Sequence, residues 1–249
     1  MRCFFEIAYD GTNFHGWQIQ KNAISVQEVI SKKLSLLSKN KSTDILGCGR
    51  TDTGVHAKQF FFHTDLFLDL DLKQIKYKLN NMLSNDIVVL DIYQVHENAH
   101  ARFDATERTY RYYINLIKDP FNVKYSWYVN KDIDVKAMNK ACDYLCQYED
   151  FTSFSKLHTD VKTNFCKIKH ASWEIHGENL IFEITADRFL RNMVRSIVGT
   201  MIDIGTDKMD AYGIHRIIQS KNRSSAGKSA PAQGLFLESV KYPAKLKQH

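Results

Sequence analysis

Three pairs of strand-like apolar runs follow one another along this chain with no helical pattern between the two members of a pair. These paired runs cover residues 43–48 and 57–64, 86–96 and 107–117, and 165–175 and 179–186. Single runs lie at residues 2–9 and 235–241. Parallel neighbours need a long crossover connection, usually a helix, whereas antiparallel neighbours need only a turn. The pattern therefore predicts an α+β fold with a mixed, mainly antiparallel sheet rather than a doubly wound one.

Helical periodicity separates these groups of strands. The helical patterns cover residues 25–38, 72–83, 134–147, 188–204 and 210–219. Ser25 and Glu28 have the spacing of a capping box at the first helix. We expect two lobes, residues 1–105 and 106–249. Because no Pro- or Gly-rich linker separates them, we expect the lobes to share one continuous sheet flanked by helices.

The basic charge of the chain lies in its C-terminal part. The chain has 249 residues, of which 44% are hydrophobic, and a net charge of +6. From Thr152 onward there are 15 Lys and Arg against 9 Asp and Glu, which leaves 19 against 19 before it. A one-sided basic excess suits a polyanionic partner such as RNA, although many ordinary enzymes are equally basic.

Neither a membrane segment nor a metal site is indicated by the sequence. No apolar stretch is long enough to span a bilayer, and Arg2 interrupts any signal-peptide core, so we expect a cytoplasmic protein. The five cysteines contain no CxxC pair, which favours reduced, buried thiols. An alternative zinc set would combine Cys142, Cys146, His158 and Cys166, but their intervals match no common ligand spacing. The sequence therefore predicts no metal.

The most unusual short segment is "GCGRTDTGVHA" at Gly47–Ala57, between two strand-like runs. Glycine permits positive φ and removes side-chain bulk, so its three glycines suit a tight, exposed turn that a flat substrate can approach. Arg50 and Asp52 lie two residues apart in this loop. They are either a surface ion pair of little energetic value or part of a reactive site, and composition does not decide between these interpretations.

The segment "GRTDTGVHA" at 49–57 resembles the catalytic motif of the TruA family of tRNA pseudouridine synthases. The resemblance covers nearly the whole chain. Further similar motifs are "YDGTNFHGWQIQ" at 9–20, "SVQEVI" at 25–30, "HARFDATERTYRYYI" at 100–114, "DFTSF" at 150–154, "FLRNMVRSIVGTM" at 189–201 and "APAQGLFLESVKYP" at 230–243. Thr53 and Ser84 depart from the family's usual alanine and proline, and neither has a chemical role.

The resemblance implies a pseudouridine synthase fold with the active-site cleft between the two lobes. It implies that Asp52 is the catalytic aspartate, that Tyr110 meets the target uracil and that Arg195 is the basic partner of the aspartate. Arg50, Arg102 and Phe103 lie at matching motif positions and are expected to bind substrate. The substrate implied is tRNA, with modification at nucleotides 38, 39 and 40 of the anticodon arm by a homodimer.

This chemistry agrees with the residue types. Pseudouridine formation breaks the bond from C1′ to N1 of uracil and rejoins the base through C5, so it needs no redox cofactor or metal. The carboxylate acts as nucleophile toward the sugar or as a base, and a nearby guanidinium favours its ionised form. Hydrolytic glycosidases use two carboxylates, whereas this motif has one. A tRNA-binding module without catalysis would not need Asp52 beside arginines, and a nuclease would need more carboxylates or a metal.

Two elements are expected to carry the remaining residues. In the strand "RTYRYY", alternation puts Tyr110 and Tyr112 on one face, and Tyr113 on the other is expected to be a core residue. In the helix over 188–204, Arg188, Arg191 and Arg195 lie opposite the apolar side, together with Gly199. Gly199 thins the helix so that another segment can approach. Arg195 is expected in the cleft, with Arg188 and Arg191 as phosphate contacts.

Overall fold

The computed structural model describes residues 1–38, 44–66, 70–156 and 163–246. The chain forms two compact units, Met1–Thr106 with Leu237–His249 and Glu107–Phe236. Residues from Leu237 onward, which include most of the last strand, belong to the unit that contains the N-terminal segment. The division of the chain into two lobes at residue 105 stays a prediction.

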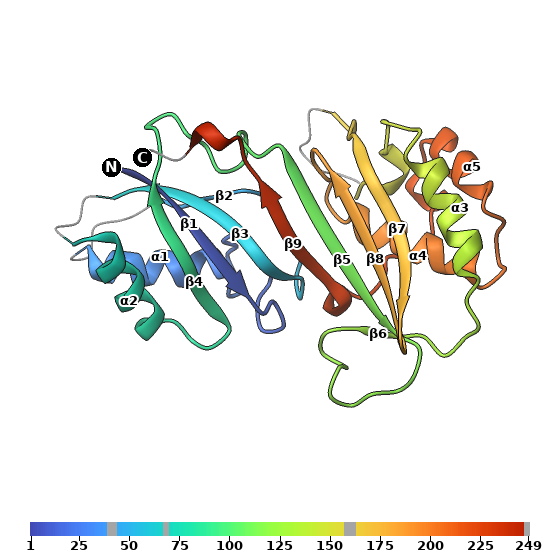
Figure 1. The fold of residues 1–249 in the computed structure, drawn as a ribbon, viewed down its shortest axis with the longest axis horizontal. Helices are drawn as coiled ribbons and strands as arrows, with labels where there is room; N and C mark the ends of the chain where they lie inside the picture. Colours follow the sequence, from blue (N-terminus) through green and yellow to red (C-terminus); the bar gives the residue numbers. More distant parts are fainter. Residues whose placement is uncertain (39–43, 67–69, 157–162, 247–249) are drawn as a thin grey trace. The chain divides into compact units, whose positions relative to one another are not determined.

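The first unit combines a sheet with two helices (Figure 1). Its strands are β1 (Arg2–Tyr9), β3 (His56–Asp65) and β4 (Ile87–Gln94), with the end of β9 (Leu235–Lys241) and the short β2 (Leu46–Gly47) on β3. The strand order is β4-β1-β3-β9, and β1 pairs antiparallel with both neighbours. Phe5 on β1 lies opposite Phe62 on β3, and their rings stack at 4.6 Å.

The helices of this unit begin at side-chain caps. Helix α1 (Val26–Leu37) starts after Ser25, whose hydroxyl accepts a hydrogen bond from the Glu28 backbone at 3.2 Å. This confirms the predicted cap, while the Glu28 carboxylate pairs with Lys32. Helix α2 (Leu72–Met82) starts after Asp71, whose carboxylate caps Gln74. Such caps satisfy backbone donors that have no partner within the helix.

The second unit contains a sheet with three helices against it (Figure 1). Its elements are β5 (Glu107–Asn115), β6 (Trp127–Tyr128), α3 (Val135–Leu145), η1 (Thr152–Phe154), β7 (Ile168–His176), β8 (Asn179–Ala186), α4 (Met193–Gly205), α5 (Gly213–Ser220), η2 (Arg223–Ser225) and η3 (Ala232–Gly234). Strands β5, β8 and β7 pair antiparallel, and β6 pairs parallel with β5. Both units together confirm the predicted α+β fold with a mixed, mainly antiparallel sheet.

Helix α4 differs from its prediction in where it begins and in what it exposes. It starts at Met193 rather than at residue 188, because Asn192 adopts the left-handed conformation with φ of 65°. Arg188 and Arg191 therefore do not lie on the helix. Eleven of its thirteen residues are buried, so it has no solvated arginine face. A helix that is apolar on nearly all sides is typical of a core helix.

Gly199 is the point where another segment meets α4, as the sequence predicted. A Cβ at this position would lie 1.7 Å from the carbonyl oxygen of Lys228. One residue earlier, the backbone N–H of Gly227 donates to Thr200 Oγ1 at 2.9 Å. The segment between η2 and η3 thus lies directly on the helix backbone, which a side chain at position 199 would prevent.

The cysteines are mostly buried thiols. Cys3, Cys48, Cys142 and Cys166 are buried, but Cys146 is exposed, contrary to the expectation for it. Burial raises the pKa of Cys166 to about 12, so this group stays protonated near neutral pH. His158, which completed the alternative zinc set, lies outside the described residues.

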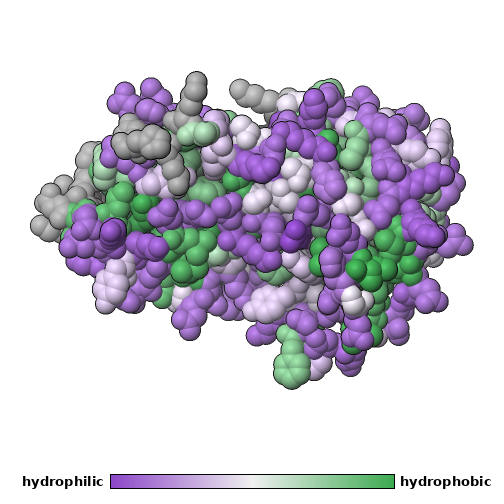
Figure 2. Space-filling model, in the orientation of Figure 1, coloured by the Kyte–Doolittle hydropathy of each residue, from purple (hydrophilic) through white to green (hydrophobic). Residues whose placement is uncertain are grey.

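Two kinds of feature are absent from the part of the chain that the structure describes. It contains no group of three or more His, Cys, Asp or Glu side chains that could hold a metal ion. In the same residues, no helix is long and apolar enough to cross a membrane. On the face drawn in Figure 2, hydrophilic residues cover most of the surface and hydrophobic ones form smaller patches.

Gly199→Ala should destabilise the protein by about 1–3 kcal/mol, because the new methyl group overlaps a backbone carbonyl that is held on both sides. Urea unfolding of the variant and wild type measures this difference. The matched control is Gly49→Ala, since no atom lies within 4 Å of a Cβ there, and it should change stability by less than about 1 kcal/mol. Equal stability of Gly199→Ala and wild type would contradict the close approach.

His63 should make the protein less stable in mild acid. It is buried on β3, and its Nδ1 accepts a hydrogen bond from the Ala101 backbone at 3.1 Å. Burial first, then His100 and Arg2, lowers its pKa from 6.5 to about 4. The unfolded chain therefore binds this proton first, so the stabilisation is present above pH 6.5 and is lost as the pH falls toward 4.

This loss is on the order of 3 kcal/mol. His63→Asn keeps an acceptor oxygen without titrating, so its unfolding free energy should fall less between pH 7 and pH 4.5. Denaturant unfolding at several pH values makes the comparison, in which the carboxylates common to both proteins cancel. The same loss in both proteins would be evidence against the role of His63.

Candidate active site

The aspartate loop, defined here as residues 48–55, connects β2 to β3. Arg50 in this loop is exposed and Asp52 is half-buried. A tight turn follows the aspartate, because the backbone N–H of Val55 donates to the Asp52 carbonyl at 3.2 Å. Gly54 stands inside this turn with φ of 77°, a conformation that glycine adopts without strain.

The segment 9–16 holds the aspartate loop at its backbone. A Cβ on Gly11 would lie 2.0 Å from the Val55 carbonyl oxygen, and one on Gly16 would lie 2.1 Å from that of Thr51. The Thr51 hydroxyl and the Tyr9 hydroxyl are 2.9 Å apart. Only glycines allow this approach, so the N-terminal motif serves to hold the residues on both sides of Asp52.

A buried histidine ends the loop at the first residue of β3. His56 is 1% exposed, and its Nδ1 accepts from the Gly11 backbone at 3.1 Å and lies 3.0 Å from an Asp10 carboxylate oxygen. The same oxygen of Asp10 accepts from the Thr12 backbone at 2.9 Å. These contacts tie the beginning of β3 to the turn that follows β1.

The two glycines before Asp52, Gly47 and Gly49, differ in what surrounds them. A Cβ at Gly47 would lie 2.6 Å from the Trp17 ring, so this glycine makes room for a buried indole rather than for a substrate. Gly49 has open space around it. The expectation of a glycine-lined approach therefore fits Gly49 and not Gly47.

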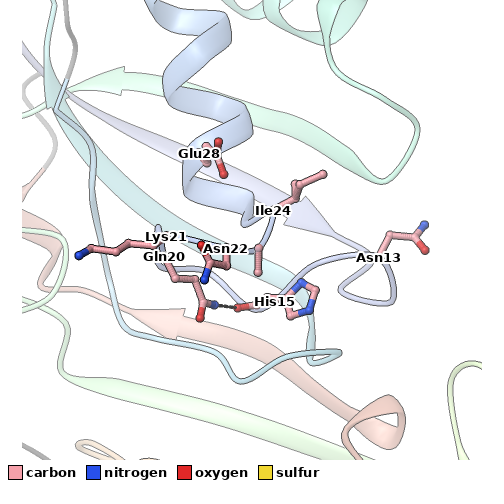
Figure 3. Close-up of a pocket in the computed structure, with 8 residues that line it drawn as sticks. Asn13, His15, Gln20, Lys21, Asn22, Ile24 and Glu28 are labelled. Atoms are coloured by element: carbon pink, nitrogen blue, oxygen red, sulfur yellow. Dashed lines mark hydrogen bonds between the residues drawn. The ribbon is translucent and has the colours of Figure 1, made fainter.

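A pocket of about 400 Å³ lies between the turn after β1 and the start of α1 (Figure 3). Its lining consists of polar residues and two apolar ones, namely Asn13, His15, Gln20, Lys21, Asn22, Ala23, Ile24 and Glu28. The Gln20 amide donates to the His15 carbonyl at 2.6 Å across it. None of the candidate site residues lines this pocket.

Arg102 and Phe103 lie in the same unit as Asp52, on the turn that precedes β5. Both are exposed, and the Arg102 guanidinium carbon is 5.7 Å from the centre of the Phe103 ring. Phe103 also contacts the ring of His100 at 4.3 Å.

Tyr110 belongs to the second unit, in the middle of β5. It pairs with Ile184 on β8, and Phe189 stands perpendicular to its ring at 5.2 Å. Tyr112 is fully buried in the core, whereas Tyr113 is half-buried and packs on Phe236. The expectation that Tyr113 is a core residue is therefore wrong, because the face of Tyr112 is the one that the helices cover.

Arg195 is held by the segment that crosses α4. Its Nε donates to the Ala230 carbonyl at 2.7 Å, and the Ala230 N–H donates back to the Arg195 carbonyl at 2.9 Å. The hydroxyl of Tyr112 donates to the next carbonyl, that of Pro231, at 2.8 Å. Burial raises the pKa of Tyr112, while the positive charge of Arg195 acts in the opposite direction. The guanidinium is thus fixed in direction beside the aromatic strand.

The turn between β8 and α4 carries the two other arginines. Arg188 is half-buried and Arg191 is exposed. The Arg188 backbone N–H donates to the Asp187 carboxylate at 2.7 Å. The Arg191 carbonyl accepts a hydrogen bond from the backbone N–H of Lys156 at 3.1 Å. Phe189 lies between them and brings this turn to Tyr110.

The candidate residues thus form two groups. Asp52, Arg50, Arg102 and Phe103 lie in the first unit, with Asp52 and Arg50 on one loop. Tyr110, Arg188, Arg191 and Arg195 lie in the second unit, around β5 and the start of α4. Sequence reasoning missed the residues that support them. Gly11, Gly16 and Ala230 act through their backbones, and the only signal was that they stand in the quoted motifs.

Comparison with known proteins identifies the family of this chain. The model of the tRNA pseudouridine synthase family matches residues 141–243. The tRNA pseudouridine synthase A of Bacteroides fragilis is 50% identical over 247 residues, 98% of each chain. That of Porphyromonas gingivalis is 46% identical over 98% of each chain, and that of Bacillus licheniformis is 38% identical over 97% of this chain and 99% of its own.

A solved structure of the CRISPR endoribonuclease Cse3 bound to a 19-nucleotide RNA covers 82% of this chain and 97% of its own. Its TM-score of 0.21 and identity of 8% are too low to carry an argument. The curated relatives are decisive by contrast, since their matches cover nearly the whole chain at 38–50% identity. The chain therefore belongs to the family of tRNA pseudouridine synthase A, an isomerase of tRNA modification.

Proposed function

We propose that this chain isomerises uridine to pseudouridine at positions 38, 39 and 40 of the tRNA anticodon stem-loop, with Asp52 as the catalytic carboxylate. The main support is the way in which the aspartate loop is held, since Gly11 and Gly16 bring the segment 9–16 against the backbone on both sides of Asp52. Family membership supports the substrate class. The proposal includes a homodimer that acts in the cytoplasm.

The reaction needs one ionised carboxylate and a pocket for a base. The bond from C1′ to N1 breaks, the uracil turns while bound, C1′ bonds to C5, and the proton of C5 leaves while N1 gains one. Asp52 acts either as the nucleophile at C1′ or as the base that removes a sugar proton. Since atoms and electrons balance within the substrate, the reaction consumes no redox cofactor.

Arg195 is proposed as the positive partner of Asp52. Its Nε is committed to the Ala230 carbonyl, which orients the guanidinium before substrate binds. A preoriented charge loses less free energy to reorganisation during the reaction than a mobile one. Arg195 would thus both favour the ionised carboxylate and aim it.

Tyr110 is proposed to receive the target uracil after the base leaves the helical stack. Such a base needs an aromatic or apolar surface to replace its lost stacking. Tyr110 is half-buried and is supported by the perpendicular ring of Phe189, so its position does not depend on the substrate. Arg50, Arg188 and Arg191 are proposed to contact phosphates, which would position the RNA without reading its sequence.

The experiment that tests the proposed function is tritium release from C5 of uracil in unmodified tRNA. A tRNA-binding protein without catalysis would bind this RNA and release no tritium. Release should occur from tRNAs with uridine at positions 38 to 40 and should stop when these uridines are replaced by cytidine.

Asp52→Asn keeps the size of the side chain but removes its charge, so it should abolish tritium release. Its affinity for tRNA should stay within a few-fold of wild type, because phosphate contacts supply most of the binding free energy. The exposed Asp132→Asn is the matched control and should keep full activity. Substantial turnover by Asp52→Asn would remove Asp52 from the mechanism.

Arg195→Ala should lower kcat and move the acidic limb of the pH–rate profile to higher pH. The reason is that Asp52 must be ionised to react, and it loses the positive neighbour that favours its ionised form. Arg195→Lys keeps a positive charge and should show a smaller displacement. The measurement is kcat against pH for wild type and both variants.

Arg191→Ala is the control for an arginine that contacts only phosphate. It should weaken binding and reduce the slope of log affinity against log salt by about one, with an unmoved acidic limb. If Arg195→Ala behaves in this way instead, Arg195 is a phosphate contact and not the partner of Asp52.

A further inference from the structure

The turn before β5 presents a phenylalanine to solvent next to an arginine. Phe103 is 75% exposed, and the Arg102 guanidinium carbon lies 5.7 Å from the centre of its ring. A single exposed apolar residue is ordinary on a protein surface. What distinguishes Phe103 is the arrangement of rings and hydrogen bonds that holds it outward.

A row of three rings connects Phe103 to the core of its unit. The ring of His100 lies 4.3 Å from Phe103, and the ring of His63 lies 4.6 Å from His100. His63 is buried on β3, and its Nδ1 accepts from the Ala101 backbone at 3.1 Å. The exposed ring is therefore supported from beneath and is not a loose side chain.

His100 also fixes the backbone from which Phe103 projects. Its Nδ1 accepts from the backbone N–H of Arg102 at 3.1 Å and from that of Phe103 at 3.4 Å. Its own backbone N–H donates to the Asp104 carboxylate at 2.7 Å. This nitrogen must carry no proton, and burial lowers the pKa of His100, which favours the neutral ring.

We infer that Phe103 is a stacking platform for an unpaired base of the RNA substrate, and that His100 is the positioning residue that holds the platform in place. Base stacking on aromatic rings tolerates any base, and a guanidinium beside the ring suits the phosphate of the same nucleotide. This inference rests on the proposed function for the identity of the ligand as tRNA. The inference assigns to Phe103 a nucleotide other than the target uridine, which Tyr110 is proposed to receive.

A matched control is present in the second unit. Phe121 is 89% exposed, so it has the same side chain at least as open to solvent as Phe103. If exposure alone produced RNA binding, the two phenylalanines would behave alike. The inference requires that they differ, because the ring row and the His100 hydrogen bonds belong to Phe103.

The first test measures the affinity of Phe103→Ala and Phe121→Ala for unmodified tRNA and for its isolated anticodon stem-loop. Phe103→Ala should bind about 5- to 100-fold more weakly, the range for loss of one stacked base. KM should rise with kcat nearly unchanged. Phe121→Ala should bind like wild type. Phe103→Trp keeps an aromatic ring at this position and should bind RNA about as tightly as wild type. The fluorescence of the added indole should be quenched when the stem-loop binds.

The second test separates positioning by His100 from mere folding. His100→Ala removes the acceptor for the two backbone N–H groups and should weaken RNA binding as Phe103→Ala does. His100→Asn supplies a short acceptor oxygen, which holds such turns elsewhere, and should recover most of the affinity. In the background of Phe103→Ala, His100→Ala should have little further effect, because the platform is already lost.

Three results would overturn the inference. Equal losses of affinity in Phe103→Ala and Phe121→Ala would show a nonspecific effect. Unchanged RNA affinity together with a changed sedimentation coefficient would show that Phe103 is a contact between two copies of the chain. Absence of indole quenching would show that no base stacks there. A wild-type protein that binds tRNA through Phe103 but forms no pseudouridine would instead reject the proposed function and support the platform.

Discussion

The contact of backbone with backbone between the segment 9–16 and the aspartate loop is the constraint on which the first unit depends. Gly11 and Gly16 have no side chain because the carbonyls of Val55 and Thr51 occupy that space. Surface loops are usually the mobile part of a domain. The aspartate loop, by contrast, is packed at its main chain on both sides of Asp52. This packing restricts the backbone from which the Asp52 carboxylate projects.

The second unit uses the same device at a helix. Gly199 allows the Lys228 carbonyl to lie on α4. Two residues later, Ala230 exchanges hydrogen bonds with the backbone and the guanidinium of Arg195. Tyr112 joins this segment to β5 through the Pro231 carbonyl. A buried helix, a strand and an irregular segment therefore act together to orient the guanidinium of Arg195. Directed hydrogen bonds to carbonyls hold a guanidinium in place without neutralising it.

The sequence was sufficient for the fold class and for most helices and strands, since both follow from hydrophobic periodicity. It failed at the start of α4, because Phe189 and Leu190 continue the apolar period of the helix although Asn192 breaks it. There the left-handed backbone places the Asn192 amide 2.6 Å from Ser229. Such a contact depends on a segment far along the chain, which local patterns do not report. Gly47 is a similar case, because the tertiary fold places the Trp17 ring against it and the local sequence does not show this.

In the candidate site too, the sequence motifs indicate the reactive residues but not what the supporting residues do. Charged and aromatic residues such as Asp52, Tyr110 and Arg195 are readable because their chemistry is in the side chain. The residues that position them act through missing side chains and carbonyl oxygens, as Gly16 and Ala230 do. Catalysis tolerates an error of well under 1 Å in the position of a reacting group. Supporting residues are therefore as constrained as reactive ones, and their identity becomes interpretable only once the backbone they approach is known.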